Sequence, residues 1–182
     1  WHAYRQLRLQ NNAPFSAFLK IDETFILSLS PERFLRFDKN AVLTQPIKGT
    51  RPRSENTQFD EYLASQLMAS EKDKAENLMI VDLLRNDLSK TCELGSVKVD
   101  ELFSVQSFSA VHHLVSTISA KLKSNETPFS CFNACFPGGS ITGAPKIRAM
   151  QIIHELEPNA RSIYCGSIGY FGFNGVCDSN IA

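Results

Sequence analysis

The sequence has no excess of either charge and no long apolar run. Among its 182 residues, 19 are Lys or Arg and 19 are Asp or Glu, so the formal net charge is 0. Nucleic-acid-binding proteins normally carry a basic excess, and a membrane helix needs roughly 20 consecutive apolar residues, which this sequence lacks. Because no signal peptide is recognisable either, we expect a cytoplasmic protein that binds neither nucleic acid nor a membrane.

The signatures of disulfide frameworks and zinc sites are also missing. The number of cysteines is odd, their spacing is irregular, and no CxxC pair or Cys/His cluster occurs. Two of them lie one helical turn apart in an apolar stretch, which favours buried free thiols in a reducing compartment over disulfides. The cysteines are Cys92, Cys131, Cys135, Cys165 and Cys177.

The composition is that of a globular protein, and the pattern along the chain indicates strands first, then helices, then strands again. Apolar residues make up 43% of the chain and charged residues 21%, values that exclude disorder. This order predicts an α+β fold with a mainly antiparallel sheet. Strands are expected in the first 46 residues (Ser16–Ile21, Thr24–Leu29, Arg33–Phe37, Ala41–Gln45), then at Val97–Val99, Leu102–Val105 and Val111–Leu122, and as a final hairpin of Ser162–Phe173 with Val176–Ile181. Helices are expected at Gln58–Ser70 (with Thr57 as N-cap), Lys72–Leu88, after Thr127-Pro128, and at Pro145–Leu156, and Pro46–Arg53 is expected as a loop.

The segment Phe136–Lys146 is rich in glycine and hydroxyl residues just before an expected helix. Glycine lets a backbone approach a ligand closely, and the free amides of a helix start, with the hydroxyls of Ser140 and Thr142, can bind an anion. The segment is not a P-loop, because Gly143 is followed by Ala144 where that motif has lysine. The alternative is an ordinary capped helix start.

Glu76 stands in an apolar helical stretch, on one stripe with Ile80, Leu83 and Asp87. A carboxylate on a mostly buried helix has to be paired, protonated or bound to a cation. Mg²⁺ is one such cation, whereas an ion pair with Arg85 or a lysine is the commoner arrangement.

Three further side chains are candidates for chemistry, although each has a commoner structural explanation. Lys48 can act as an amine nucleophile if it is partly desolvated, but most loop lysines are solvated. Glu32 can act as an acid if a pocket raises its pKa, or it can pair with Arg33. Strand alternation points one of His112 and His113 inward, where it either contacts a substrate or is a satisfied core histidine.

Five segments, in this order, resemble the motifs of the chorismate-utilising enzymes and extend over nearly the whole chain. They are Ser28–Arg33, Pro46–Arg51, Lys74–Asp87, Phe136–Lys146 and Tyr164–Tyr170. The resemblance implies part of a two-sheet antiparallel sandwich with flanking helices, and an enzyme that acts on chorismate. Lys48 resembles the residue that marks the branch aminating chorismate at C4 to 4-amino-4-deoxychorismate, for p-aminobenzoate and folate biosynthesis. The anthranilate-forming branch has Ala there, and usually His at the position of Asn77.

The resemblance also implies roles for individual residues. Lys48 would be the nucleophile that forms a covalent adduct, Glu32 the general acid, and His113 an active-site histidine near the ring. Glu76 would be one of the carboxylates that hold Mg²⁺, the implied cofactor, and a glutamine amidotransferase subunit would supply ammonia. The residues that would line the chorismate pocket are Gly49, Thr50, Gly139, Ser140, Thr142, Gly143, Ala144, Lys146 and Tyr170.

Parts of the family pattern have no counterpart among these residues. The pattern includes an N-terminal region and continues with Ile-Arg-Thr and a second Mg²⁺-binding Glu. Residues 1–182 are therefore expected to be an incomplete chorismate-binding catalytic domain with little or no activity by itself. Two other functions stay open, an anthranilate synthase component I and a non-catalytic chorismate-binding module. The presence of Lys48, Glu32, Glu76 and His113 argues against the second.

Overall fold

The computed structural model describes residues 1–182 and shows an α+β fold with antiparallel sheets, as expected. The helices are α1 (His2–Gln10), α2 (Thr57–Ala69), α3 (Glu71–Thr91), α4 (Pro128–Cys135), α5 (Gly139–Thr142) and α6 (Lys146–Leu156). The strands are β1 (Phe15–Ile21), β2 (Thr24–Ser30), β3 (Arg33–Asp38), β4 (Ala41–Gln45), β5 (Ile47–Pro52), β6 (Lys98–Ser107), β7 (Val111–Lys121), β8 (Gly169–Phe171) and β9 (Val176–Asn180).

Strand β7 is the centre of the larger, seven-stranded sheet. Its residues 111–115 pair with β5 and its residues 118–121 with β4, while β6 pairs along most of its length. Strands β4 and β5 therefore lie end to end on one edge of β7, joined by Pro46. From β4 the sheet continues through β3 and β9 to β8. This topology brings the start of β3, with Glu32, next to β5, with Lys48.

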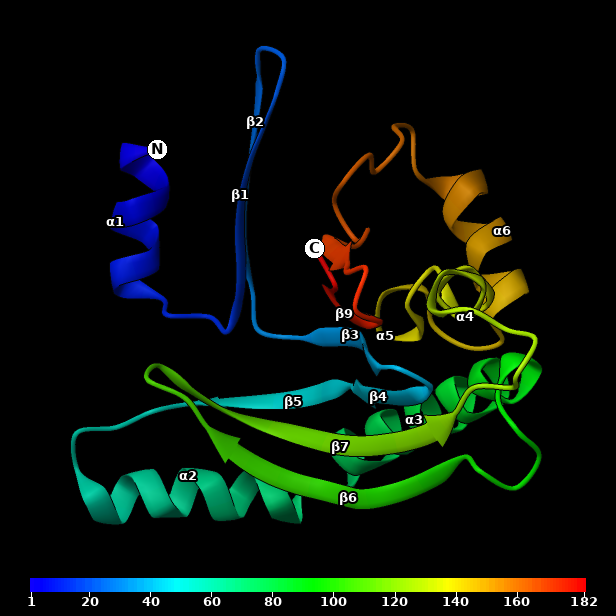
Figure 1. Ribbon diagram of the computed structural model, residues 1–182. Coiled ribbons are helices and arrows are strands. Elements are labelled where there is room, and N and C mark those ends of the chain that lie inside the picture. The colour runs from blue at the N-terminus through cyan, green and yellow to red at the C-terminus, as the bar shows by residue number, and fades with distance from the viewer.

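Helices α2 and α3 cover one face of this sheet (Figure 1). The core between α3 and the sheet includes Leu35, Ile80, Leu88 and Ile118, each exposed by 1% or less. Burying a side chain of this size stabilises a fold by about 1.5–3 kcal/mol. The packing of α3 on the sheet therefore fixes the position of those α3 residues that face β5.

Capping residues set where three helices begin. Asn56 accepts a backbone hydrogen bond at the start of α2, although Thr57 was expected in that role. Ser70 ends α2 and caps α3 in the same way, so the two helices follow one another directly. Thr127 and Ser130 form a capping box at α4, as the Thr-Pro sequence predicts.

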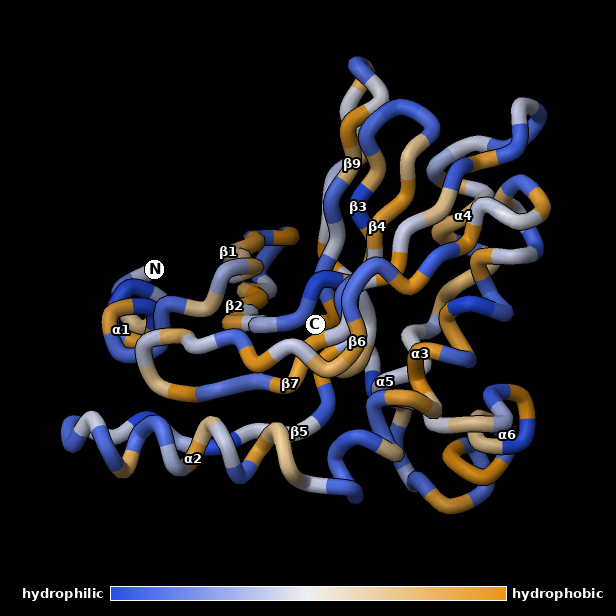
Figure 2. Tube along the Cα trace, turned by 90° about the horizontal axis from the view of Figure 1, so that it is seen from below, coloured by the Kyte–Doolittle hydropathy of each residue, from blue (hydrophilic) through white to orange (hydrophobic).

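Two parts of the chain lie outside the core. Strands β1 and β2 form a separate two-stranded sheet that projects from the rest of the fold, with α1 beside it (Figure 1). The rings of Tyr4 and Phe18 pack between α1 and this hairpin, with centroids 5.5 Å apart. Helix α6 buries none of its residues, and its apolar positions appear as orange segments in Figure 2.

Four expectations about secondary structure were wrong. In the expected hairpin, Ser162–Phe173 is strand only at β8, and residues 162–165 form a turn instead. The N-terminal stretch, expected among the strands, forms helix α1, which buries only Tyr4. The expected loop Pro46–Arg53 contains strand β5, because pairing with β7 satisfies its backbone whatever its side chains are. The separate strands expected at Val97–Val99 and Leu102–Val105 are one irregular strand, β6, whose register shifts near Phe103 at φ +60°.

The cysteines behave as the sequence predicts. All five are free, and four of them are buried. The Cys131 thiol lies within hydrogen-bonding reach of Cys92 and Cys135, beneath the end of α3. None of the helices combines the length and the apolar character that crossing a membrane requires.

Candidate active site

Lys48 reaches the glycine-rich segment from β5. Its Nζ donates a hydrogen bond to the carbonyl oxygen of Ser140 at 2.6 Å. The strand turns here because Gly49 has a φ of +91° and the pairing with β7 shifts register. A Cβ atom at Gly49 would lie 2.8 Å from the Cβ atom of Asp73. Glycine at this position is therefore required by the backbone angle and by the closeness of α3.

Glu32 precedes β3 and meets the same part of the glycine-rich segment. Its Oε1 accepts a hydrogen bond from the Ile47 amide at 3.4 Å. Burial raises the pKa of Glu32 to about 7, and this effect outweighs the lowering of the pKa by a hydrogen bond with the Ser140 side chain, by the Ile47 amide and by the charge of Lys48. Below pH 7 the carboxyl group is therefore mostly protonated and can donate a proton.

His113 on β7 pairs with Thr50 on β5, two residues after Lys48. Its Nδ1 is 2.9 Å from the Thr50 hydroxyl oxygen, and its ring centroid is 5.5 Å from that of Phe108. The side chain is buried, and burial lowers the pKa of His113 against a smaller opposing effect of the Gly49 backbone. The imidazole is therefore neutral at pH 7, which suits hydrogen bonding to a substrate better than charge pairing.

His112 is buried too, so the expectation that one of the two histidines points outward was wrong. Its Nε2 is 3.0 Å from Asp60 Oδ1 on α2, and its Nδ1 is 2.8 Å from the Ser107 hydroxyl. Because α2 covers this face of β7, both faces of the strand are buried at this point. His112 is therefore a satisfied core histidine, and only His113 belongs to the candidate site.

The glycine-rich segment is packed against its neighbours. A Cβ atom on Gly138 would lie 2.5 Å from Ile181 Cδ1, and one on Gly139 would lie 2.5 Å from Leu83 Cδ2. At these two glycines neighbouring side chains approach the backbone closely, while ligand binding by the segment stays a prediction. The Thr142 hydroxyl donates within the segment, to the Gly138 carbonyl at 3.2 Å.

The remaining residues expected to line the pocket do not converge on Lys48. Gly143, at φ +93°, and the exposed Ala144 form the turn into α6. Tyr170 is 58% exposed on the edge strand β8. It borders a hollow of about 580 Å³ together with Arg33 and Asp178.

The ammonium group of Lys146 is held inside the fold. It donates to Asp87 Oδ2 at 2.5 Å and to the Cys135 carbonyl oxygen at 2.7 Å. Asp87 is 1% exposed and also accepts from Lys90 at 2.8 Å. The structure thus directs Lys146 to Asp87 and away from the place where Lys48 and Glu32 meet.

Glu76 lies on the face of α3 that passes both β5 and the glycine-rich segment. Positions 73, 76, 80 and 83 share one stripe of the helix. Asp73 lies against Gly49, and Leu83 lies against Gly139. Glu76 therefore lies between the two elements that meet at Lys48.

The environment of Glu76 is compatible with a role as one ligand of a divalent cation. Its carboxylate is 45% exposed, and its nearest cationic partner, Lys72 Nζ, is 3.9 Å away. Mg²⁺ is usually held by one or two carboxylates together with water and substrate oxygens. No three His, Cys, Asp or Glu side chains come together as a metal site, so the chain does not form a complete protein cage around an ion.

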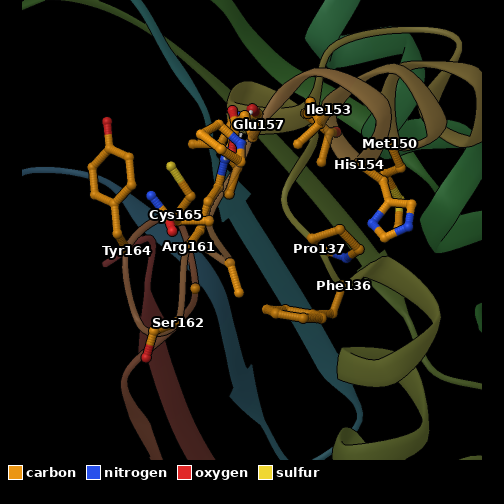
Figure 3. A pocket seen from close by; sticks show the side chains of 16 residues that line it. Phe136, Pro137, Met150, Ile153, His154, Glu157, Arg161, Ser162, Tyr164 and Cys165 are labelled. Atoms are coloured by element: carbon orange, nitrogen blue, oxygen red, sulfur yellow. Dashed lines mark hydrogen bonds and ion pairs between the residues drawn. The ribbon is translucent and has the colours of Figure 1, made fainter.

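Two hollows flank the Glu32 side of the site. Glu32 and strand β2 border a hollow of about 710 Å³ that is closed by residues 161–164. A second hollow, of about 580 Å³, lies between α6 and the loop that follows it, with Phe136 and His154 on one side and Tyr164 across from them (Figure 3). Arg161, Ser162 and Tyr164 line both hollows, and Lys48 lines neither.

Sequence reasoning missed a buried polar pair beside the candidate site. Asn77 is 0% exposed; its Nδ2 donates to the Leu114 carbonyl oxygen at 3.2 Å, and its Oδ1 accepts from the Ser116 hydroxyl at 2.6 Å. These bonds join α3 to β7 next to Glu76. The sequence shows Asn77 and Ser116 each as a polar residue within an apolar stretch. Only the tertiary structure shows that the two side chains bond to each other.

Comparisons with known proteins identify the family of the chain. Residues 1–182 match the model of the chorismate binding enzymes, and the chain belongs to this family. It is similar to aminodeoxychorismate synthase component 1 of Klebsiella aerogenes, at 55% identity over 181 residues, and to that of Escherichia coli (strain K12), at 56% over 181 residues. Each comparison covers 100% of this chain and 40% of the relative, so the chain spans well under half the length of these curated relatives.

The fold is similar to a solved structure of the same family. The crystal structure of anthranilate synthase component I from Streptococcus pneumoniae TIGR4 matches with a TM-score of 0.88 and 37% identity, over 98% of this chain and 39% of that one. The expected family and fold class are thereby confirmed, as is the similarity to aminodeoxychorismate synthases. The roles expected of individual residues stay predictions.

Proposed function

We propose that the protein aminates chorismate at C4 to give 4-amino-4-deoxychorismate, in the route to p-aminobenzoate and folate. The observation that carries this proposal is the meeting of Lys48 and Glu32 at Ser140. A lysine amine lies there beside a carboxyl group that desolvation keeps protonated near neutral pH. The similarity to aminodeoxychorismate synthases supports the same reaction.

Lys48 would act as the nucleophile. Its amine, once deprotonated, attacks C2 of chorismate while both ring double bonds shift by one position and the C4–O bond breaks. Ammonia then adds at C4, both double bonds shift back, and the C2–N bond to Lys48 breaks. A covalent intermediate replaces one difficult displacement by two easier ones.

Glu32 would supply the proton that the departing hydroxyl needs, so that water is the leaving group. Its burial favours this role, because it keeps the proton on the carboxyl group up to about pH 7. His113, buried and neutral, would hydrogen-bond near the ring. Gly49, Thr50, Gly139, Ser140 and Thr142 would form the wall of the chorismate site beside Lys48. Gly143, Ala144, Lys146 and Tyr170, which do not converge on Lys48, are left out of this proposed wall.

Glu76 would hold Mg²⁺ as one carboxylate ligand. When bound, Mg²⁺ supplies charge stabilisation to a substrate carboxylate. The half-exposed carboxylate of Glu76 forms a long ion pair, 3.9 Å, with the exposed Lys72, and a bound ion would replace that pair. Replacing Glu76 by Gln would therefore raise the Mg²⁺ concentration needed for half-maximal rate.

Ammonia would come from a glutamine amidotransferase subunit. The relatives are named as component 1 of their synthases, which supports a second component. The five free cysteines support a reducing compartment such as the cytoplasm. Because the chain spans 40% of the length of these relatives, we expect little or no turnover from the 182 residues alone.

Product analysis tests the proposal. The full-length gene product is incubated with chorismate, Mg²⁺ and an ammonium salt, which removes the need for the amidotransferase. We expect 4-amino-4-deoxychorismate by mass spectrometry, and no product from Lys48→Ala, while the exposed control Lys98→Ala retains the activity. Product formation by Lys48→Ala would contradict the covalent step.

Two other outcomes identify the alternatives. Anthranilate with pyruvate would indicate an anthranilate synthase, which the fold similarity to that enzyme keeps open. Chorismate binding without any product would indicate a non-catalytic binding module. The 182-residue chain, assayed in parallel, tests whether the expected loss of activity is real.

A further inference from the structure

Lys146 joins both ends of the glycine-rich segment to α3. Cys135 is the last residue of α4 and Lys146 is the first residue of α6, so together they flank Phe136–Pro145. The Lys146 ammonium donates to the Cys135 carbonyl oxygen at 2.7 Å and to Asp87 Oδ2 at 2.5 Å. One side chain therefore fixes the entry and the exit of the segment to the same point on α3.

The middle of the segment is where the candidate site begins. The Ser140 carbonyl oxygen accepts from Lys48 Nζ at 2.6 Å, and the Ser140 side chain lies near enough to Glu32 to lower the pKa of its carboxyl group. Gly139, next to it, packs on Leu83 of α3, one turn before Asp87. Movement of the segment would therefore move Ser140, which contacts both proposed reacting side chains, Lys48 and Glu32.

We propose that Lys146 is a positioning residue: its bonds to Asp87 and the Cys135 carbonyl hold the glycine-rich segment so that Ser140 aligns Lys48 with Glu32. This inference rests on the proposed function and replaces the role of substrate ligand that the sequence suggested for Lys146.

The surroundings of Lys146 favour positioning over substrate binding. Its side chain is 13% exposed and Asp87 is almost fully buried, so turning the ammonium toward a substrate would leave a carboxylate poorly compensated. Lys90 also contacts Asp87, at 2.8 Å, but it lies on α3 itself with a side chain 52% exposed. Lys90 thus contributes charge to Asp87 without touching the segment, which makes it a matched control.

The first measurement needs no substrate. Trace acetylation of the full-length protein with acetic anhydride, quantified by mass spectrometry, reports how accessible the Lys48 amine is relative to Lys72, whose side chain is 83% exposed. Lys146→Met should raise the relative labelling of Lys48 by about threefold or more, whereas Lys90→Met should leave it unchanged. Equal labelling in the two variants would overturn the proposal.

The second measurement separates positioning from ligand binding. Lys146→Met should lower kcat for chorismate amination by roughly 10- to 100-fold with little change in KM, and Lys90→Met should change neither. A raised KM with unchanged kcat would assign Lys146 to the substrate and overturn the inference.

A second variant covers the case in which Lys146→Met does not fold. Asp87→Asn keeps the shape and still accepts a hydrogen bond from Lys146, so it should give a smaller rise in Lys48 labelling. No rise in this variant would overturn the proposal. If the unmodified protein does not aminate chorismate, the proposed function fails, while the labelling experiment still decides whether Lys146 holds the segment.

Discussion

Two lysines contact the glycine-rich region, and the carboxyl groups beside them have different hydrogen-bond partners. Asp87 accepts short hydrogen bonds from Lys146 and Lys90. Glu32 accepts only a 3.4 Å bond from a backbone amide and a bond with Ser140, because Lys48 donates to the Ser140 carbonyl instead. Both carboxyl groups are sheltered from water, yet only the first is neutralised by direct contact with cations.

The difference teaches how one loop can serve both the fold and the proposed reaction. A buried carboxylate in contact with two ammonium groups holds elements together. A desolvated carboxyl group without such contact keeps its proton near neutral pH, as the pKa of about 7 for Glu32 shows. Asp87 should therefore matter to stability, and Glu32 to activity.

The largest expected effect is on activity, through Glu32. Glu32→Gln keeps the shape of the protonated carboxyl group but cannot give up its proton, so kcat for chorismate amination should fall by about 10²- to 10⁴-fold. Below pH 4.5 the free energy of unfolding should change little, since the Glu32 carboxyl group is then mostly neutral in both the folded and the unfolded chain. The exposed Glu23→Gln is the control, and full activity in Glu32→Gln would show that the proton comes from elsewhere.

The reciprocal change is at Asp87. Asp87→Ala leaves the Lys146 ammonium, 13% exposed, without its carboxylate, so the free energy of unfolding should fall by about 3–5 kcal/mol. Asp82→Ala removes an exposed pair with Arg85 on the same helix and should cost less than about 0.5 kcal/mol. Urea unfolding measures both values, and similar losses in the two variants would erase the contrast between the sites.

Gly49 tests how tightly the backbone under Lys48 is fixed. Gly49→Ala combines a φ of +91° with contacts near 2.8 Å to Asp73 and 2.9 Å to Leu67, so it should cost about 2–4 kcal/mol in the free energy of unfolding. Gly95→Ala has a similar φ of +77° but open space around it, and should cost about 1 kcal/mol. Because both variants carry the backbone strain, the difference between their losses measures the steric crowding at Gly49. A negligible difference would mean that α3 moves away to make room for the added methyl group.

The smallest effect is the pH dependence that Glu32 gives to stability. Its pKa in the fold, about 7, lies above the ordinary value of 4.5, so its contribution to stability is complete below pH 4.5 and is lost as the pH rises to about 7. Relative to Glu32→Gln, the protein should lose about 1–3 kcal/mol across this window. Unfolding curves of both proteins between pH 4.5 and 8 measure the loss, and parallel curves would mean that Glu32 is ionised throughout.

Much of the fold was predictable because local patterns carry it. Alternating apolar residues gave the strands of the β1–β2 hairpin and of β3, β4 and β7, and Thr127-Pro128 placed α4. Strand β5 was missed because its side chains carry no alternation and its hydrogen bonds come from a distant strand. Helix α1 was missed because only Tyr4 in it is buried, against the hairpin.

The sequence alone determined the family and the list of candidate residues. Composition, turn residues and five ordered motifs depend on neighbours along the chain, and so they could be recognised without coordinates. The tertiary structure decided which candidates meet. It places Lys48 and Glu32 together beside Ser140, and it pairs Lys146 with Asp87. Those choices depend on burial and on contacts between segments far apart in sequence, and local pattern does not contain that information.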